Sequence, residues 1–332
     1  MIITRTPFRI SFFGGGTDYP VYYRENGGAV LATTIDKYCY ISCRYLPPFF
    51  EHTHRVVYSK IENVKSISEI EHPSAKAVLQ FMKINSGVEI HHDGDLPART
   101  GLGSSSSFTV GLLHSLYALK GLMPTKMQLA KEAIHIEQDI IKENVGSQDQ
   151  VSAAFGGFNR IDFNRDGTIN VSTVIISKEK LDLLQGHLMF FFTGFSRTAS
   201  EVAKKQIENT PKKKNELSTM HQMVDEALAI LNNEHGDILD FGRLLHKAWE
   251  LKRSLTDKIS TSEIDNIYEV ARTTGALGGK LMGAGGGGFM VIFAEPDIQP
   301  RIRTRLRGLL EVPFKFENTG SQIIFYQPDG LY

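Results

Sequence analysis

A glycine- and serine-rich stretch at residues 95–107 has the residue types and spacing that bind phosphate. It reads Asp-Leu-Pro-Ala-Arg-Thr-Gly-Leu-Gly-Ser-Ser-Ser-Ser, and apolar residues then recur at helical spacing as far as Lys120. The four serines therefore lie at a predicted helix N-terminus, where unpaired N–H groups and the helix dipole attract anions. Gly101 and Gly103 let the backbone approach a phosphate without an intervening Cβ. Because a capped helix needs only one serine, we interpret the stretch as a phosphate-binding loop.

A second stretch, residues 278–289, holds seven glycines in twelve positions directly before a predicted strand. Ordering so many glycines costs much backbone entropy, so close approach to a ligand explains the stretch better than a plain turn. Two such loops are typical of the two walls of a nucleotide triphosphate site. A dinucleotide-binding reductase is disfavoured, because neither loop shows Gly-x-Gly-x-x-Gly after a strand with an acidic residue downstream.

An acidic residue, Glu137, lies where an apolar side chain is expected. It shares one face of a predicted helix over residues 125–144 with Ala130, Ile134 and Ile141. A buried carboxylate needs a partner, and three explanations stay open: a salt bridge, a position at the edge of the apolar face, or a divalent cation.

Four side chains have types suited to phosphoryl transfer. The reaction needs a cation to neutralise phosphate oxygens, a group that takes the hydroxyl proton, and a positive charge near the transferred phosphoryl. Ser105 and Glu137 are candidate Mg²⁺ ligands, Asp149 is a candidate proton acceptor, and Arg9 is a candidate source of charge.

Composition is that of a globular protein of two expected domains. The 332 residues include 37 basic and 37 acidic side chains, so no net charge draws the chain to nucleic acid or an anionic membrane. Without a signal-peptide pattern or an apolar run of about 18 residues, we expect a cytoplasmic protein. The basic clusters at 212–214 and 301–307 lack interleaved aromatic residues and are interpreted as solvated helix faces.

Apolar periodicity predicts strands in the first half and mainly helices between residues 198 and 274. Strands are expected at 2–13, 30–45, 56–59, 88–92, 158–163, 171–176, 188–193, 289–293 and 323–326. Helices are expected at 104–120, at 125–144 with Thr125 as N-cap, in three stretches within 198–274, and at 297–310. The uninterrupted apolar strand 188–193 suits a buried central position.

These motifs together resemble the GHMP kinases, the family of galactokinase, homoserine kinase, mevalonate kinase and phosphomevalonate kinase. The resemblance spans the chain through three motifs: Pro7-Phe-Arg-Ile-Ser-Phe-Phe-Gly-Gly-Gly-Thr-Asp18, Pro97-x-x-x-Gly-Leu-Gly-Ser-Ser-Ser-Ser107 and Gly283-Ala-Gly-Gly-Gly-Gly-Phe289. It implies a two-domain α+β fold. An N-terminal ATP-binding domain like domain 2 of ribosomal protein S5 would cover residues 1–175, and a ferredoxin-like C-terminal domain would cover 176–332.

The resemblance also implies roles for individual positions. Asp149 falls on the catalytic aspartate, Arg9 on the basic residue that assists it, and Ser105 and Glu137 on the Mg²⁺ ligands. The expected ATP-binding positions are Pro97, Gly101, Leu102, Gly103, Ser104, Ser105, Ser106 and Ser107. The expected substrate-binding positions are Gly16, Thr17, Asp18, Gly283, Gly285 and Gly286, with Arg197 and Lys280 added below.

Within the family, residues 14–18 and 146–150 are most similar to bacterial enzymes that phosphorylate the anomeric hydroxyl of D-glycero-D-manno-heptose 7-phosphate. Galactokinases carry Gly-Glu-His before Thr-Asp in the first motif, so the difference argues against galactose. An acceptor that already bears a phosphate requires a basic pocket, for which Arg197 is the first candidate and Lys280 the second. A surface ion pair stays open as the alternative for Arg197.

We therefore expect an ATP- and Mg²⁺-dependent sugar 1-kinase that makes heptose 1,7-bisphosphate for nucleotide-activated heptose synthesis. Two alternatives stay open: a related kinase for an unphosphorylated sugar such as fucose or mannose, and a catalytically silent sensor of ATP and sugar. The expected partners are ATP and a sugar phosphate, without nucleic acid or membrane. The sequence leaves the oligomeric state open, with a homodimer as one option.

Overall fold

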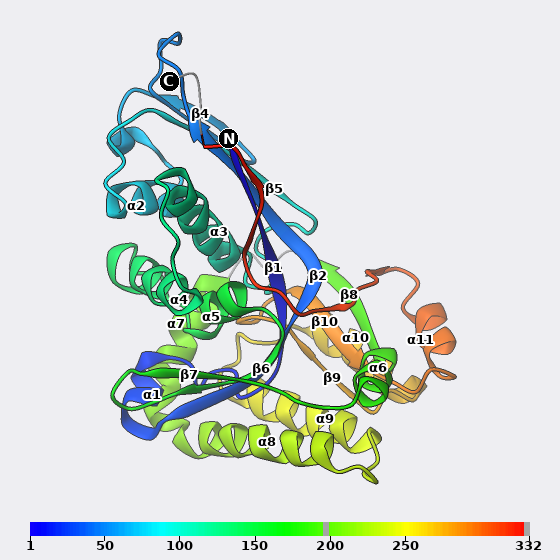
Figure 1. The fold of residues 1–332 in the computed structure, drawn as a ribbon. Coiled ribbons are helices and arrows are strands. Elements are labelled where there is room, and N and C mark those ends of the chain that lie inside the picture. The colour runs from blue at the N-terminus through cyan, green and yellow to red at the C-terminus, as the bar shows by residue number, and fades with distance from the viewer. Residues whose placement is uncertain (195–198, 329–332) are drawn as a thin grey trace.

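The computed structural model describes residues 1–194 and 199–328 and has an α+β architecture (Figure 1). Its strands are β1 (Ile2–Phe13), β2 (Gly28–Tyr45), β3 (His54–Val57), β4 (Ile61–Val64), β5 (Val88–Gly94), β6 (Phe158–Phe163), β7 (Ile169–Thr173), β8 (Leu188–Gly194), β9 (Gly278–Leu281), β10 (Gly288–Phe293), β11 (Leu310–Glu311), β12 (Phe316–Glu317) and β13 (Gln322–Tyr326). Its α-helices are α1 (Pro20–Asn26), α2 (Pro73–Phe81), α3 (Ser104–Leu119), α4 (Lys126–His135), α5 (Gln148–Phe155), α6 (Lys178–Gly186), α7 (Ala199–Asn209), α8 (Lys214–Asn232), α9 (Leu239–Ser254), α10 (Ser262–Thr274) and α11 (Gln299–Arg305). Short 3₁₀ turns occupy Ile67–Glu69 and Thr210–Lys212, and a π-helical turn occupies Ile136–Ile140.

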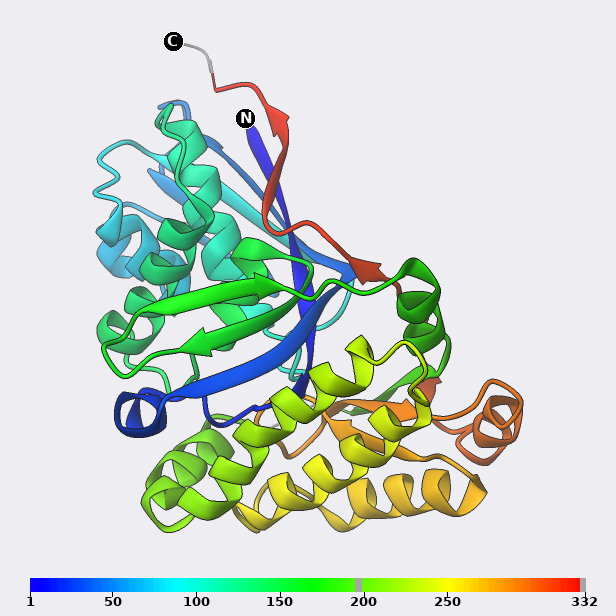
Figure 2. The same cartoon turned by 60° about the horizontal axis from the view of Figure 1, so that its bottom comes forward.

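The larger sheet is built around β1 and the long strand β2. Its central path runs β13-β1-β2-β5-β3-β4, while β6 and β12 also pair with β2, and β7 pairs with β6. The antiparallel ladder between β1 and β2 shifts register between Pro7 and Phe8 and again between Ser11 and Phe13. Figure 2 shows β13 lying beside β1, antiparallel to it. The end of the chain therefore completes the sheet that its beginning starts.

Helix α3 packs on β1 and β2, and α5 packs on α3, α4 and β1. Close contact between α3 and the sheet requires Gly111, because a Cβ there would lie 2.9 Å from Thr6 Oγ1. This packing brings the N-terminal ends of α3 and α5 together at β1.

The smaller sheet is antiparallel in the order β11-β8-β10-β9. Strand β8 is interior in this order, which confirms its expected central position. Helix α9 lies against β9, where a Cβ on Gly278 would come within 2.0 Å of Gly242 O. The absence of a side chain at Gly278 lets the strand and the helix touch through their backbones.

One face of the smaller sheet shares an apolar core with the larger sheet, while its other face packs in a separate apolar cluster. Phe12 and Phe13, at the end of β1, pack edge-on against Phe241 of α9, with ring centroids 5.4 and 5.1 Å apart. Val224 of α8 lies next to Gly14, immediately after β1. The end of β1 is therefore held between elements from both halves of the chain.

Several expected elements are confirmed at their boundaries. Strand β1 covers Ile2–Phe13, and α3 begins at Ser104. Thr125 caps α4, since its hydroxyl accepts from Gln128 N at 3.1 Å. Within the described residues, no helix is both long enough and apolar enough to cross a membrane.

Other expectations are wrong. The region expected to hold three helices holds four in its described part, residues 199–274, because a 3₁₀ turn at Thr210–Lys212 separates α7 from α8. Residues 148–155, where the sequence predicted neither a helix nor a strand, form α5, so Asp149 lies in the first turn of a short helix. Lys280, expected in a glycine loop, lies in β9 with a buried side chain.

Candidate active site

The serine-rich loop ends at Gly103, the left-handed N-cap of α3. Gly101 and Gly103 both have φ of 78°, a conformation that favours glycine. The buried side chain of Ser107 donates to Pro7 O at 3.0 Å and so fixes the first turn of α3 to β1. By helix geometry, the first N–H groups of α3 have no partner within the helix, so this end is able to bind an anion.

The two glycine loops are in direct backbone contact. A Cβ on Gly101 would lie 2.5 Å from Met282 O, and one on Gly283 would lie 2.4 Å from the Cα of Gly101. Thr100 O accepts a hydrogen bond from Phe289 N at 3.2 Å. The loops that the sequence indicated as two walls of one site are therefore neighbours.

Arg9 and Asp149 form a bidentate ion pair at the phosphate loop. Arg9 Nε and Nη2 donate to Asp149 Oδ1 and Oδ2 at 2.8 and 2.9 Å, and Nη1 donates to Gly101 O at 2.6 Å. The side chain of Arg9 is 5% exposed and that of Asp149 is 24% exposed, so the Asp149 side chain remains partly open to solvent. A Cβ on Gly103 would lie 3.3 Å from the carboxyl carbon of Asp149, which places this carboxylate at the start of α3.

Asp18 is a second, buried carboxylate close to this pair. Its two oxygens accept from Gly16 N at 2.9 Å and from Gln148 N at 3.3 Å. Burial raises the pKa of Asp18, and repulsion from Asp149 adds to that rise. A Cβ on Gly146 would lie only 1.9 Å from Asp18 Oδ2, so glycine is required there. Asp18 thus joins the loop after β1 to the start of α5.

Within the described part of the chain, two buried polar atoms near these carboxylates have no hydrogen-bond partner. They are Ser11 Oγ and Gln148 Oε1. Gly15 lies between the two residues, since a Cβ there would be 3.8 Å from Ser11 Oγ and 3.8 Å from Gln148 Nε2. Buried polar atoms are normally paired, so these two are free to bind the polar groups of a ligand.

Glu137 is fully buried in the π-helical turn and is held by neutral groups. Its carboxylate accepts hydrogen bonds from Ser106 Oγ at 2.8 Å, Thr109 Oγ1 at 2.7 Å and Gln150 Nε2. Burial raises the pKa of Glu137 to about 7. The hydroxyl beside Glu137 is that of Ser106, whereas the side chain of the expected ligand Ser105 is exposed.

The donor set around Glu137 fits a hard divalent cation. Carboxylate and hydroxyl oxygens are suitable Mg²⁺ ligands, and Mg²⁺ commonly takes one or two carboxylates together with substrate phosphates. Throughout the described residues, no basic side chain pairs with Glu137, and no cluster of three or more His, Cys, Asp or Glu residues is placed to hold a metal. A cation here would therefore depend on phosphate oxygens to complete its shell.

Two buried lysines lie behind the loops. Lys280 donates from Nζ to Phe12 O at 2.9 Å, and burial lowers its pKa to about 7. Lys252 donates to Leu281 O at 2.9 Å and to Gly283 O at 2.6 Å, and burial lowers its pKa well below the ordinary value. Both ammonium groups are thus bound to backbone carbonyls of glycine-flanked segments.

Four other residues expected to bind substrate lie in two separate loops. The hydroxyl of Thr17 is buried and donates to backbone carbonyls, and Gly16 is buried with φ of 105°. Gly285 and Gly286 lie in the second glycine loop, both at positive φ. Arg197 lies outside the described residues.

Sequence reasoning missed Lys252. Leu245, Trp249 and Lys252 follow one another at i, i+4 and i+7 on α9, so the lysine lies on a buried apolar face. The same argument that identified Glu137 would have identified this residue.

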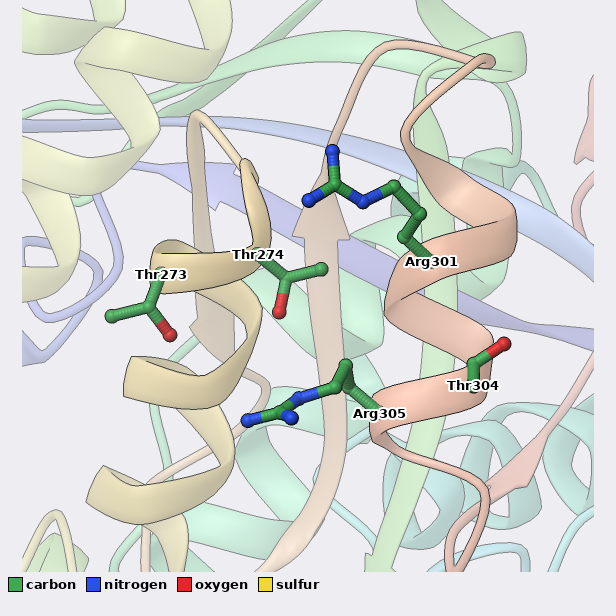
Figure 3. A pocket seen from close by; sticks show the side chains of 5 residues that line it. All are labelled: Thr273, Thr274, Arg301, Thr304 and Arg305. Carbon is green, nitrogen blue, oxygen red and sulfur yellow. The ribbon is translucent and has the colours of Figure 1, made fainter.

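A separate hollow of about 460 Å³ lies between α10 and α11 (Figure 3). Arg301 and Arg305 of α11 extend toward α10, which carries Thr273 and Thr274. Because no residue of the loops or of the Arg9–Asp149 pair lines it, this hollow is distinct from the candidate active site.

An anion-binding helix end lies next to a second glycine loop and to a carboxylate that is paired with an arginine. These are features that phosphoryl transfer requires. Family models for the GHMP kinases N terminal domain and the GHMP kinases C terminal match residues 71–157 and 226–311. The chain belongs to the GHMP kinases.

Several curated relatives are kinases whose names give a sugar or a sugar phosphate as the acceptor. The chain is 29% identical over 320 residues to a D-glycero-alpha-D-manno-heptose 7-phosphate kinase of Campylobacter jejuni, covering 92% of this chain and 93% of the relative. It is 27% identical to a galactokinase of Pyrococcus furiosus, covering 99% of both. A Bacteroides fragilis L-fucokinase/L-fucose-1-P guanylyltransferase is 26% identical over 92% of this chain but only 35% of its own length. The protein is accordingly an ATP-dependent kinase that phosphorylates a sugar hydroxyl.

Solved structures confirm the two-domain fold. A D-glycero-D-manno-heptose 1-phosphate kinase from Bacteroides thetaiotaomicron superposes with a TM-score of 0.72 at 23% identity, covering 97% of this chain and 98% of the other. A Streptococcus pneumoniae phosphomevalonate kinase gives a TM-score of 0.77 at 16% identity, covering 95% and 100%. Acceptors as different as these show that the fold alone does not set the substrate.

Proposed function

We propose that this kinase transfers the γ-phosphoryl group of ATP to the anomeric hydroxyl of D-glycero-D-manno-heptose 7-phosphate. The product would be the 1,7-bisphosphate, an intermediate suited to nucleotide-activated heptose synthesis. The observation that carries the proposal is the Arg9–Asp149 pair at the phosphate loop, beside unpaired buried oxygens that suit a polyol. Near full-length similarity to a heptose 7-phosphate kinase supports the choice of sugar.

Asp149 would accept the proton of the attacking hydroxyl. Its carboxylate is oriented by Arg9, and its side chain is partly open to solvent, so an acceptor is able to approach it. An anomeric hydroxyl is more acidic than an ordinary alcohol, so a carboxylate is able to take its proton late in a loose transition state. The bond from the sugar oxygen to phosphorus forms as the bond from phosphorus to the leaving oxygen of ADP breaks.

Arg9 has two tasks in this account. It holds Asp149 in one orientation, and it brings a positive charge beside Gly101, where phosphates would bind. Fixed charge of this kind stabilises the oxygens of a phosphoryl group in the transition state.

The loop from Pro97 to Ser107 would bind the ATP phosphates through the N-terminal N–H groups of α3. Glu137, with Ser105 and Ser106, would hold Mg²⁺, which would neutralise charge on the phosphate oxygens. Asp18 would keep the loop after β1 against α5, so that Ser11 and Gln148 present their free oxygens to the sugar.

Recognition of the 7-phosphate is assigned to Arg197 and Lys280. Lys280 supplies a buried positive charge at the end of β1, where its ammonium already binds Phe12 O. A kinase for an unphosphorylated sugar is the second candidate, because a galactokinase and a fucokinase are almost as similar to this chain as the heptose kinase is.

A comparison of acceptors distinguishes the two candidates. Initial rates with ATP and Mg²⁺ would be measured for heptose 7-phosphate, the free heptose, fucose, mannose and galactose. We expect kcat/KM for the 7-phosphate to exceed that of each free sugar by at least about 100-fold. The double variant Arg197→Met/Lys280→Met should lose this preference while keeping activity on free sugars. Equal or greater kcat/KM on a free sugar in the wild-type enzyme would support the second candidate instead.

A further inference from the structure

Lys252 is a buried cation that ends in the second glycine loop. It lies in the last turn of α9, is 6% exposed, and its Nζ binds the carbonyls of Leu281 and Gly283. Nζ is also 6.0 Å from the centre of the Trp249 ring. Across the described residues, no carboxylate lies within ion-pair distance of this ammonium. Its hydrogen-bond partners are therefore backbone atoms of the loop.

The two carbonyls fix the orientation of two peptide groups. In a trans peptide, the C=O of one residue and the N–H of the next point in opposite directions. The peptide group that contains Leu281 O also contains the N–H of Met282. This N–H donates to Phe289 O at 2.8 Å and closes the base of the loop. The peptide group that contains Gly283 O also contains the N–H of Ala284. Because Gly283 O binds Lys252 of α9, this N–H points away from α9, and it has no acceptor among the described residues.

The loop depends on contacts of this kind because it has few side chains of its own. Ile259, in the segment after α9, accepts from Gly286 N at 3.0 Å through its carbonyl, and a Cβ on Gly285 would lie 2.7 Å from its Cα. On the other side, Gly283 touches Gly101 of the phosphate loop. A glycine segment otherwise samples many conformations, so its shape has to be set by these external anchors.

We propose that Lys252 is a positioning residue for phosphoryl transfer, which fixes the second glycine loop so that the Ala284 N–H binds a phosphate of ATP. This inference rests on the proposed placement of ATP at the two loops, and it does not depend on which sugar is the acceptor.

The electrostatic setting agrees with an anionic ligand. Lys252, Lys280 and Arg9 are close enough that each of the other two cations lowers the pKa of Lys252, after the larger effect of burial. Asp18 has the opposite effect on Lys252. A bound polyphosphate would offset the mutual repulsion of the three cations.

Direct measurement of ATP binding tests the proposal, because it requires no acceptor. In Lys252→Met the apolar stem keeps its length while the ammonium is lost. Loss of hydrogen bonds made by a charged group typically weakens an interaction by about tenfold or more. We expect the dissociation constant of ATP, measured by calorimetry, to rise by about tenfold, and the KM for ATP to rise with it while the KM for the sugar stays within about twofold.

Two controls on α9 separate positioning from stability. Lys247→Met removes an exposed lysine from the same helix and should leave ATP binding unchanged. Leu245→Ala removes buried side-chain volume and should lower the melting temperature while leaving the ATP dissociation constant within about twofold. Folding of every variant would be checked by circular dichroism.

Lys252→Gln provides the test if the methionine variant does not fold. Its shorter amide is able to reach at most one of the two carbonyls, so we expect ATP affinity to fall by about threefold or more. A variant that folds, loses stability and still binds ATP as tightly as the wild type would overturn the proposal. If instead the wild-type protein binds ATP but does not phosphorylate heptose 7-phosphate, the proposed acceptor fails while this test stands.

Discussion

Asp149 is the residue on which the chemical step depends in this account. Asp149→Asn keeps the size of the side chain but removes its negative charge and turns one acceptor of Arg9 into a donor. We expect kcat to fall by about 100- to 10,000-fold, while the ATP dissociation constant changes by less than about threefold. Rapid-quench turnover and calorimetry would measure the two quantities. Collapse of ATP binding would show that Asp149 supports the nucleotide site instead.

Glu137 should make the free protein less stable as pH rises. Its native pKa is about 7 and its ordinary value is 4.5, so between these values the native state holds a proton that the unfolded state has released. The free energy of unfolding therefore falls as pH rises through this window, and the loss is complete above about pH 7.

Glu137→Gln should remove this dependence. In this variant the new amide oxygen is able to accept from Ser106 and Gln150. The new NH₂ group is able to donate to Thr109 Oγ1, because the Thr109 hydroxyl is able to donate its own hydrogen to Ser105 O. Without ATP or Mg²⁺ at pH 8, we expect the variant to be more stable than the wild type by on the order of 2 to 3 kcal/mol, yet much less active. Urea denaturation at pH 5 and pH 8 would measure this, with Glu132→Gln as a control at a more exposed carboxylate. Equal pH dependence in wild type and Glu137→Gln would contradict the account.

At the scale of elements, the contact between the two glycine loops is open to a direct test. Gly283 has φ of 70° and would place a Cβ 2.4 Å from the Cα of Gly101, whereas Gly121 has φ of 69° with no atom within 4 Å. Gly121→Ala therefore measures the cost of the left-handed backbone alone. We expect it to lower the free energy of unfolding by about 1 kcal/mol and Gly283→Ala by about 3 kcal/mol.

The two alanine variants should also differ in function. Gly283→Ala has to separate the loops, so we expect ATP affinity to fall by at least about tenfold, whereas Gly121→Ala should bind ATP like the wild type. Denaturation and calorimetry on the same preparations would provide both numbers. Equal losses in the two variants would show that strain in φ, not loop contact, is the cause.

Local signals explain which elements the sequence predicts well. The glycine–serine boundary predicts the start of α3 at Ser104, and Thr125 predicts the start of α4, because each signal lies within a few residues of the helix it begins. Helix α5 was missed because Gly146 and Ser147 before it are typical of turns, and its position depends on Asp18, far earlier in the chain.

The difference between local sequence signals and long-range packing also applies to the site residues. The sequence indicated Arg9, Glu137 and Asp149, but their partners are set by tertiary packing that no local pattern records. The contact of Ser106 with Glu137, and the place of Lys252 beneath the second loop, depend on which helix face the fold buries.

At the scale of the whole molecule, the end of the chain is part of the first sheet. Thr34 Oγ1 donates to Glu317 O at 2.6 Å, Thr6 and Ser321 share a hydrogen bond at 2.9 Å, and Ser321 N donates to Ala153 O at 2.9 Å. We infer that residues 1–175 fold stably only together with β12 and β13.

Truncation after Val312 tests this inference. It removes β12 and β13 and leaves one edge of β1 unpaired, so we expect a loss of at least about 3 kcal/mol in the free energy of unfolding and a loss of activity through α5, which carries Asp149. Ile324→Thr, at an exposed position of β13, is the matched control and should change stability little. A truncated protein as stable as the full chain would show that the two segments fold independently.

The position of phosphoryl transfer tests the central claim most directly. Heptose 7-phosphate would be incubated with ATP, Mg²⁺ and the wild-type enzyme, and the product examined by phosphorus NMR with coupling to the sugar protons. The account predicts a new phosphorus resonance coupled to the anomeric proton, with the 7-phosphate retained and ADP formed in equal amount. A phosphate on another ring hydroxyl, or phosphorylation of a free sugar in preference to the 7-phosphate, would contradict it.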